Sequence, residues 1–168
     1  TFSGNIVRNL SVPATGTING IREFGSSTGT KTIQNNQIYN FSTTAGGAGG
    51  ATFNGILANL GATYVIAGNE IYALTSTGTT GGTAGVLAGI QTTGSPTVTN
   101  TLSISKNRIY NISTNSTGPT VYGLLFAGPS SAPSQVQTLT ASNNFVADLK
   151  APFANSADAI RGIAVTNP

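Results

Sequence analysis

The chain contains no cysteine, histidine, methionine or tryptophan, and it has few charged residues. Without cysteine it forms no disulfide bond, and without histidine or cysteine it can build neither a zinc site of the usual ligands nor a Ser-His-Asp triad. Only 7% of its 168 residues are charged, far below the roughly 25% of an ordinary soluble domain. We therefore expect a protein that is not an enzyme and that binds no metal or other cofactor.

Long apolar runs are also missing, although hydrophobic residues make up 38% of the chain. The runs span only a few residues, which is too short for a transmembrane helix. The net charge is +3, but the basic residues are scattered rather than gathered into the dense stripe that binds nucleic acid. We expect neither a membrane span nor a nucleic-acid partner.

What the chain does contain is a phrase that recurs around one asparagine, as in NNQIYNFS at 35–42 and KNRIYNIS at 106–113. The five copies are anchored at Asn5, Asn36, Asn69, Asn107 and Asn144, in steps of 31, 33, 38 and 37 residues. A repeat of this length is typical of a solenoid, in which each unit buries the apolar surface of its neighbours. Because the chain begins and ends within a repeat, we expect a segment of a longer protein.

Two further extended runs accompany each asparagine phrase. One is centred on a glycine, with anchors at Gly20, Gly55, Gly85, Gly123 and Gly162, and is expected to mark a second bend. The other precedes the asparagine phrase, at 30–34, 62–66, 100–104 and 136–140, and Gly/Ser/Thr-rich loops separate the runs. This pattern predicts an all-β fold: a right-handed parallel β-helix of about five turns with three short strands per turn, forming one domain over 1–168.

A leucine-rich repeat is the alternative, because TLSISKNRIYNIS at 101–113 also matches its phrase. Its repeats run only about 20–29 residues, and the glycine phrase has no place in it.

Stacking of the turns would align equivalent side chains in columns. The anchor asparagines are expected to adopt the left-handed backbone conformation at a bend and to bond amide to amide in a ladder. The column at Val7, Ile38, Ile71, Ile109 and Val146 should point inward, and so should the column at Leu10, Phe41, Leu74, Ile112 and Leu149. Tyr39, Tyr72 and Tyr110 should point outward, either as a plain cross-strand stack or as a contact surface for carbohydrate or a cell-surface partner.

Four acidic residues are the only candidates for carboxylate chemistry: Glu23, Glu70, Asp148 and Asp158. Glycoside hydrolysis needs two carboxyl groups facing each other across a sugar. Glu23 and Glu70 fall in different columns, and a pair of Asp148 with Asp158 is a remote alternative. Glu70 should instead form a surface ion pair with Arg108 one turn later.

Four N-x-[ST] sequons occur, at Asn9, Asn40, Asn111 and Asn115. The first three belong to the repeat itself. Asn115, in the loop STNSTGP, is therefore the candidate for glycosylation.

The motifs TIQNNQIYNFS and LSISKNRIYNIS resemble the right-handed β-helix repeats of large secreted bacterial surface proteins, including very long adhesins and filament-like proteins. The resemblance covers the whole chain as a pattern, and it implies an extracellular, non-enzymatic structural or adhesive solenoid. Because the open ends of a parallel stack expose unpaired strand edges, we also expect self-association or continuation of the chain along the solenoid axis. The same fold carries polysaccharide-degrading enzymes, so a carbohydrate-binding module or a non-catalytic fragment of such an enzyme is the alternative function.

Overall fold

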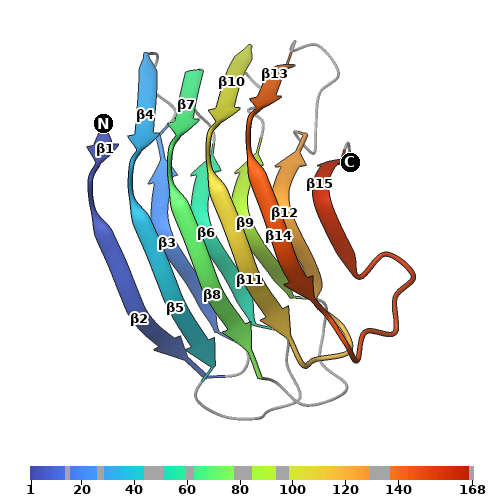
Figure 1. Ribbon diagram of the computed structural model, residues 1–168. Coiled ribbons are helices and arrows are strands. Elements are labelled where there is room, and N and C mark those ends of the chain that lie inside the picture. The colour runs from blue at the N-terminus through green and yellow to red at the C-terminus, as the bar shows by residue number, and fades with distance from the viewer. Residues whose placement is uncertain are drawn as a thin grey trace.

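The computed structural model of the chain describes residues 1–13, 16–25, 29–43, 51–59, 63–77, 85–93, 99–128 and 137–166. These residues form three parallel sheets of five strands each, and consecutive strands in a sheet come from consecutive turns (Figure 1). The predicted all-β parallel solenoid with three strands per turn is therefore confirmed. The described part of the chain contains no helix that could cross a lipid bilayer.

Each turn passes through the three sheets in the same order. Sheet A contains β1 (Phe2–Ser3), β4 (Thr30–Gln34), β7 (Thr63–Ala67), β10 (Asn100–Ser105) and β13 (Gln137–Ser142). Sheet B contains β2 (Ile6–Val12), β5 (Gln37–Thr43), β8 (Glu70–Ser76), β11 (Arg108–Thr114) and β14 (Phe145–Lys150). Sheet C contains β3 (Thr17–Phe24), β6 (Thr52–Asn59), β9 (Val86–Thr93), β12 (Thr120–Ala127) and β15 (Ile160–Thr166).

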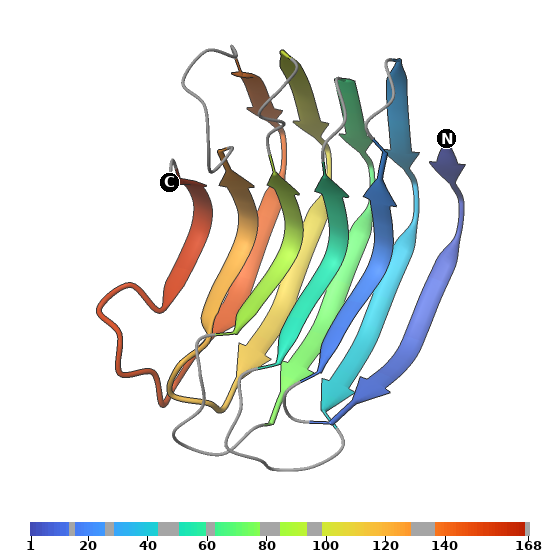
Figure 2. The same ribbon diagram turned by 180° about the vertical axis from the view of Figure 1, so that it is seen from behind.

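Sheets B and C face each other along the whole stack, and sheet A continues sheet B beyond a sharp corner (Figures 1 and 2). The core fills the space that the sheets enclose. Its inward columns in the middle turns are fully buried, as predicted: Ile38, Ile71, Ile109, Phe41, Leu74 and Ile112. Leu10, on the edge strand β2, is 37% exposed. Burial of such aliphatic side chains contributes roughly 1.5–3 kcal/mol each, so the columns stabilise the fold strongly.

An asparagine ladder runs along the corner between sheets A and B, as predicted. The side-chain nitrogen of each anchor donates to the Oδ1 atom of the anchor one turn later. These N···O distances are 2.9 Å for Asn5–Asn36, 2.8 Å for Asn36–Asn69, 2.9 Å for Asn69–Asn107 and 2.9 Å for Asn107–Asn144. The backbone N–H of each donating anchor bonds to the same Oδ1 atom, at 2.9–3.1 Å. The amides are thus satisfied although the three central ones are at most 1% exposed.

The prediction that the anchors themselves take the left-handed conformation is wrong. That conformation belongs to the residue before each anchor: Gly4, Asn35, Gly68, Lys106 and Asn143, with φ of 54–69°. None of the anchors has a positive φ, and the backbone N–H of the first four donates to the next Oδ1 atom. Glycine or asparagine occupies the preceding position in four of the five turns, as the left-handed region favours.

A second left-handed position lies within each strand of sheet B, four residues after the anchor. It is occupied by Asn9, Asn40, Ala73, Asn111 and Asp148, with φ of 52–61°. Three of these residues are the asparagines of the repeated sequons, whose recurrence therefore has a backbone cause. Asn40 Nδ2 also donates to Asn9 Oδ1 at 2.7 Å, an exposed bond between the first two turns, and Ala73 holds this position in the third turn.

The glycine column needs two corrections. In the third turn the aligned residue is Gly89 and not Gly85, because Leu87 and Ile90 take the buried positions on either side of it. The glycines also lie inside the strands of sheet C rather than at a bend. A Cβ on Gly55 would lie 2.5 Å from Ile71 Cγ2 and 2.6 Å from the Gly89 carbonyl oxygen, so close approach of sheets B and C excludes any side chain there.

Four of the Gly/Ser/Thr-rich loops between the runs, at 43–51, 75–82, 91–99 and 128–135, lie largely outside the described residues.

Candidate functional site: the tyrosine column and its polar groove

The tyrosine column lies on the outer face of sheet B, where Tyr39, Tyr72 and Tyr110 pair in register on β5, β8 and β11. Their rings stack face to face. The centroids of Tyr39 and Tyr72 are 4.8 Å apart at an interplanar angle of 5°, and those of Tyr72 and Tyr110 are 5.1 Å apart at 2°. The spacing matches the distance of about 4.8 Å between neighbouring strands, so the sheet itself sets the stack.

This geometry limits what the column can bind. A flat ligand packs on the face of an aromatic ring, but both faces of Tyr72 are covered by its neighbours. Arg8 lies next to the outer face of Tyr39, and its Nη1 atom donates to the tyrosine oxygen at 3.2 Å. Beyond Tyr110 the next residue in the column is Ala147. The column therefore offers a ligand ring edges, hydroxyl groups and, at most, the Tyr110 face above Ala147.

A polar groove of about 290 Å³ lies beside the column, over the corner between sheets A and B. Its lining combines amides, two cations and one carboxylate: Asn35, Asn36, Gln37, Gly68, Asn69, Glu70, Lys106 and Arg108. Ligand pockets usually measure about 300–1,000 Å³, so this groove is at the lower end of that range. Its two cations and hydrogen-bonding groups suit a small anionic or hydroxyl-rich group.

Glu70 connects the groove to the tyrosine column. It accepts a hydrogen bond of 3.0 Å from the Tyr110 hydroxyl and forms the predicted ion pair with Arg108, at 3.8 Å. Burial raises the pKa of Tyr110, and the hydrogen bond to Glu70 and its negative charge raise it further. Burial also raises the pKa of Tyr72, with smaller contributions from Tyr39 and Glu70. At neutral pH the Tyr72 and Tyr110 phenols therefore stay protonated, and the Tyr110 hydroxyl donates to Glu70.

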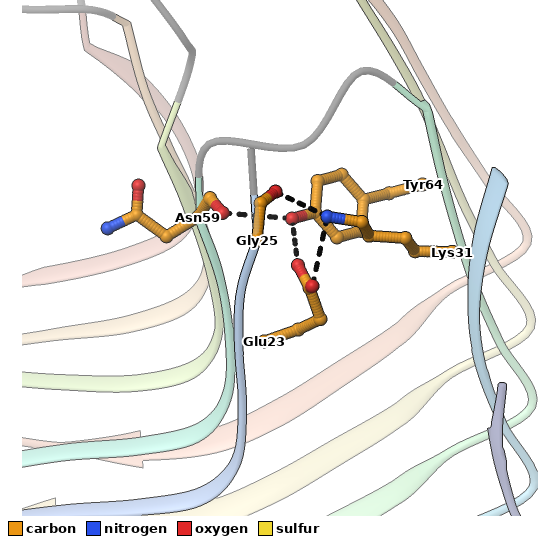
Figure 3. Close-up of polar contacts among 5 residues, drawn as sticks. All are labelled: Glu23, Gly25, Lys31, Asn59 and Tyr64. Atoms are coloured by element: carbon orange, nitrogen blue, oxygen red, sulfur yellow. Dashed lines mark hydrogen bonds and ion pairs between the residues drawn. The ribbon is translucent and has the colours of Figure 1, made fainter. Parts of the chain in front are cut away.

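A charged cluster that the sequence analysis did not identify joins the edges of sheets A and C (Figure 3). Lys31 Nζ lies 2.9 Å from Glu23 Oε1, and each of these side chains is 14% exposed. The Tyr64 hydroxyl donates to the other Glu23 oxygen and also lies 3.0 Å from the Asn59 carbonyl oxygen. Lys31 further donates to the carbonyl of Gly25. Every polar group faces another, so the cluster fastens the corner between β3 and β4 and leaves no reactive group open to a substrate.

The remaining acidic residues each have a partner of their own. Asp148 Oδ1 lies 2.7 Å from Lys150 Nζ, and Asp158 Oδ2 lies 2.9 Å from Arg161 Nη2. Asp148 also occupies the left-handed position of β14, which gives it a structural role. Among the described residues no three acidic side chains gather into a metal-binding group.

The sequon residue Asn115 is exposed, and its backbone N–H donates to the Ser76 carbonyl at 2.9 Å. Its side chain is thus positioned on the outside of the connection between β11 and β12.

Comparison with known protein families, with curated proteins and with solved structures finds no match to this chain. The fold therefore defines the class of the protein, which is a parallel β-solenoid.

Proposed function

We propose that the chain is a non-enzymatic extracellular solenoid that serves as a stiff shaft or adhesive segment of a surface or filament protein. One observation carries this proposal: the ladder from Asn5 to Asn144 is continuous and repeats the same bonds in every turn. Because the same hydrogen bonds recur in every turn, the repeat favours a uniform rod over a single specialised pocket. The resemblance of the repeats to bacterial surface proteins supports the extracellular placement.

The rod is held together by bonds that repeat along its axis. Each turn adds three strand pairings, one ladder step and one layer of the aliphatic core. Five turns at about 4.8 Å per turn give about 24 Å of axis. Bending the rod would break backbone hydrogen bonds on one side and compress a close-packed core on the other, so lateral stiffness follows from the fold.

The test is replacement of the segment in the source organism. Deletion of 1–168 in frame should leave the protein on the surface of intact cells, detected with antibodies, but should reduce attachment of the cells to surfaces. An unrelated β-solenoid of the same number of turns should restore attachment, whereas a flexible Gly/Ser linker should not. Normal attachment after the deletion, or detection only in permeabilised cells, would refute the proposal.

Carbohydrate binding is the second candidate, favoured by the groove beside Tyr110. Lys106 and Arg108 would hold a carboxylate or sulfate, and Gln37 a hydroxyl group. Binding on a glycan array that is lost in Lys106→Ala and Tyr110→Ala, but kept in the control Lys150→Ala on another part of sheet B, would establish it. In that case an unrelated solenoid would fail to restore attachment in the replacement experiment.

A further inference from the structure

The outer face of sheet A carries two rows of threonine and similar small residues, and we propose that this face binds ice. Its side chains are uncharged, regularly spaced and open to water. The proposal goes beyond the proposed shaft, because it concerns one flank of the solenoid and depends neither on its length nor on its ends.

The first row contains threonine in each of the four longer strands of sheet A, which lie side by side in Figure 1. The residues pair in register from strand to strand and so form one line along the axis. The first row consists of Thr30, Thr63, Thr101 and Thr138. The second row lies two residues further along each strand. It consists of Thr32, Val65, Ser103 and Thr140. These eight residues are called the threonine array below.

Both rows lie on the outer face because successive residues of a strand point to opposite faces of the sheet. The residues that alternate with the array in the two central strands are at most 7% exposed and belong to the core. They are Tyr64, Ile66, Leu102 and Ile104. No residue of the array is buried. The array is therefore open to solvent, while the opposite face of the same strands is packed.

The hydroxyl groups of the array have no hydrogen-bond partner in the described part of the chain. Hydroxyl groups elsewhere in the solenoid do pair with each other. Thr43 Oγ1 lies 2.7 Å from Thr77 Oγ1, and Ser113 Oγ donates to Thr75 Oγ1 at 3.3 Å. The hydroxyl groups of sheet A are thus left to bond to water.

The sheet sets the spacing of the array in two directions. Neighbours within a row are about 4.8 Å apart, and the two rows are about 6.6 Å apart, which is two residues of extended strand. The oxygen atoms of hexagonal ice repeat at similar distances along two perpendicular directions of a flat crystal face. Four strands in register therefore present water-binding groups as a two-dimensional pattern rather than as a single site.

Threonine suits such a surface because it combines a hydroxyl and a methyl group on one stiff side chain. β-Branching restricts its χ1 angle, so little side-chain entropy is lost when the array meets an ordered surface. The hydroxyl group holds a water molecule by a hydrogen bond. The methyl group offers no hydrogen bond, so the water around it bonds to other water, as it does in ice.

The distribution of charge favours ice over other partners. Lys31 is the one charged residue within the strands of sheet A, and its side chain is 14% exposed and pairs with Glu23 at 2.9 Å. Ice offers no ions with which a surface charge could pair, so an uncharged face is complementary to it. An acidic polysaccharide, an anionic lipid surface or a nucleic acid would need cations here. A protein partner would need large apolar anchors, and the array contains no apolar residue larger than valine.

The experiment measures binding of the purified 168-residue chain to ice. Ice grown slowly on a cold finger shows whether the protein enters the crystal or stays in the liquid. The temperature gap between melting and growth of a single ice crystal shows whether bound protein stops the growing surface. The wild type should enter the ice and open such a gap.

Thr101 is the position to change, because it is exposed and lies between Thr63 and Thr138 in its row. Thr101→Tyr would hold an ice surface away from the neighbouring threonines, and Thr101→Lys would place a hydrated charge among them. Both variants should lose binding to ice while they keep the wild-type circular dichroism and unfolding midpoint. Ser42→Tyr and Ser42→Lys, on the outer face of sheet B, are the matched controls and should bind ice like the wild type.

Exclusion of the wild type from ice would overturn the proposal, and so would ice binding that the folded Thr101 variants retain. Where one Thr101 variant fails to fold, the other decides the outcome. Equal loss in the Ser42 variants would also overturn it, because the effect would then not belong to sheet A. Binding of the wild type to crystalline cellulose but not to ice would assign the face to a neutral polysaccharide instead. None of these measurements uses the cell-attachment assay, so failure of this proposal can be told from failure of the proposed shaft.

Discussion

Asn69 lies at the middle of the asparagine ladder, and its replacement by alanine tests how much one ladder step contributes. Asn69→Ala removes four hydrogen bonds. Its Oδ1 atom accepts from Asn36 N at 3.0 Å and from Asn36 Nδ2 at 2.8 Å. Its Nδ2 atom donates to Asn107 Oδ1 at 2.9 Å and to the Ile33 carbonyl at 3.0 Å.

The cost comes mainly from the groups left behind. Asn107 Oδ1 keeps the bond from the Asn69 backbone, at 3.0 Å. Two donor hydrogens of Asn36 lose their only acceptor in a site where that residue is 1% exposed. Each unsatisfied buried donor costs about 1–3 kcal/mol, so we expect Asn69→Ala to lower the free energy of unfolding by roughly 3–5 kcal/mol.

Asn5→Ala is the matched control. Asn5 is exposed in the first turn, and its side chain makes one ladder bond instead of four. The expected loss is below about 1 kcal/mol. Urea unfolding followed by circular dichroism measures both variants. If Asn69→Ala costs no more than Asn5→Ala, the ladder does not stabilise the fold and the reasoning fails.

Three further predictions follow from the backbone and the tyrosines. Gly55→Ala should lower the free energy of unfolding by at least about 1–3 kcal/mol, because its Cβ overlaps the Gly89 carbonyl. Gly162→Ala should change it by less than about 0.5 kcal/mol, because its Cβ meets no other atom. Equal losses of the two variants in thermal unfolding would refute the close-approach argument. Lys106→Asn should raise stability by about 0.5–1 kcal/mol, because asparagine tolerates the φ of 58° better than lysine does; a lower urea midpoint would count against it. The raised pKa of Tyr110 means that the unfolded chain releases this proton first, so stability is full below about pH 10 and falls as the pH rises further; Tyr110→Phe should reduce that fall, and an unchanged alkaline profile would contradict it.

The repeat itself made most of the fold predictable. Apolar side chains at fixed offsets from each asparagine placed the buried columns, because a parallel stack repeats one environment in every turn. The same offsets located the tyrosine column and the Glu70–Arg108 pair. The period and the glycine-centred run also separated this fold from a leucine-rich repeat.

Backbone detail was less accessible. Asparagine favours the left-handed conformation, which predicts it at the anchor, but the structure has it one residue earlier, while the anchor's amide forms the ladder. Glycine or asparagine before four anchors was the available signal. The sequence does not distinguish Gly85 from Gly89, because an apolar residue follows each of them. Only the pairing with neighbouring strands fixes the register, and it aligns Gly89 with Gly55.

The cluster of Glu23, Lys31 and Tyr64 was not found because it joins residues from three successive turns. No motif marks such a contact, since it depends on where the sheet edges lie in space. The stacking of the tyrosine rings, which leaves few ring faces for a ligand, likewise depends on ring geometry that the spacing of residues does not reveal.

Nuclear magnetic resonance of the side-chain amides tests the central feature most directly, which is a single file of five asparagines along the corner of the solenoid. We expect cross-peaks linking the amide protons of consecutive anchors, across the 31 to 38 residues that separate them in the chain, and slow solvent exchange for the three buried ones. The exposed amide of Asn115 provides the reference for fast exchange. Anchor amides that exchange as fast as Asn115 and show no mutual cross-peaks would contradict the ladder and the stacked turns that depend on it.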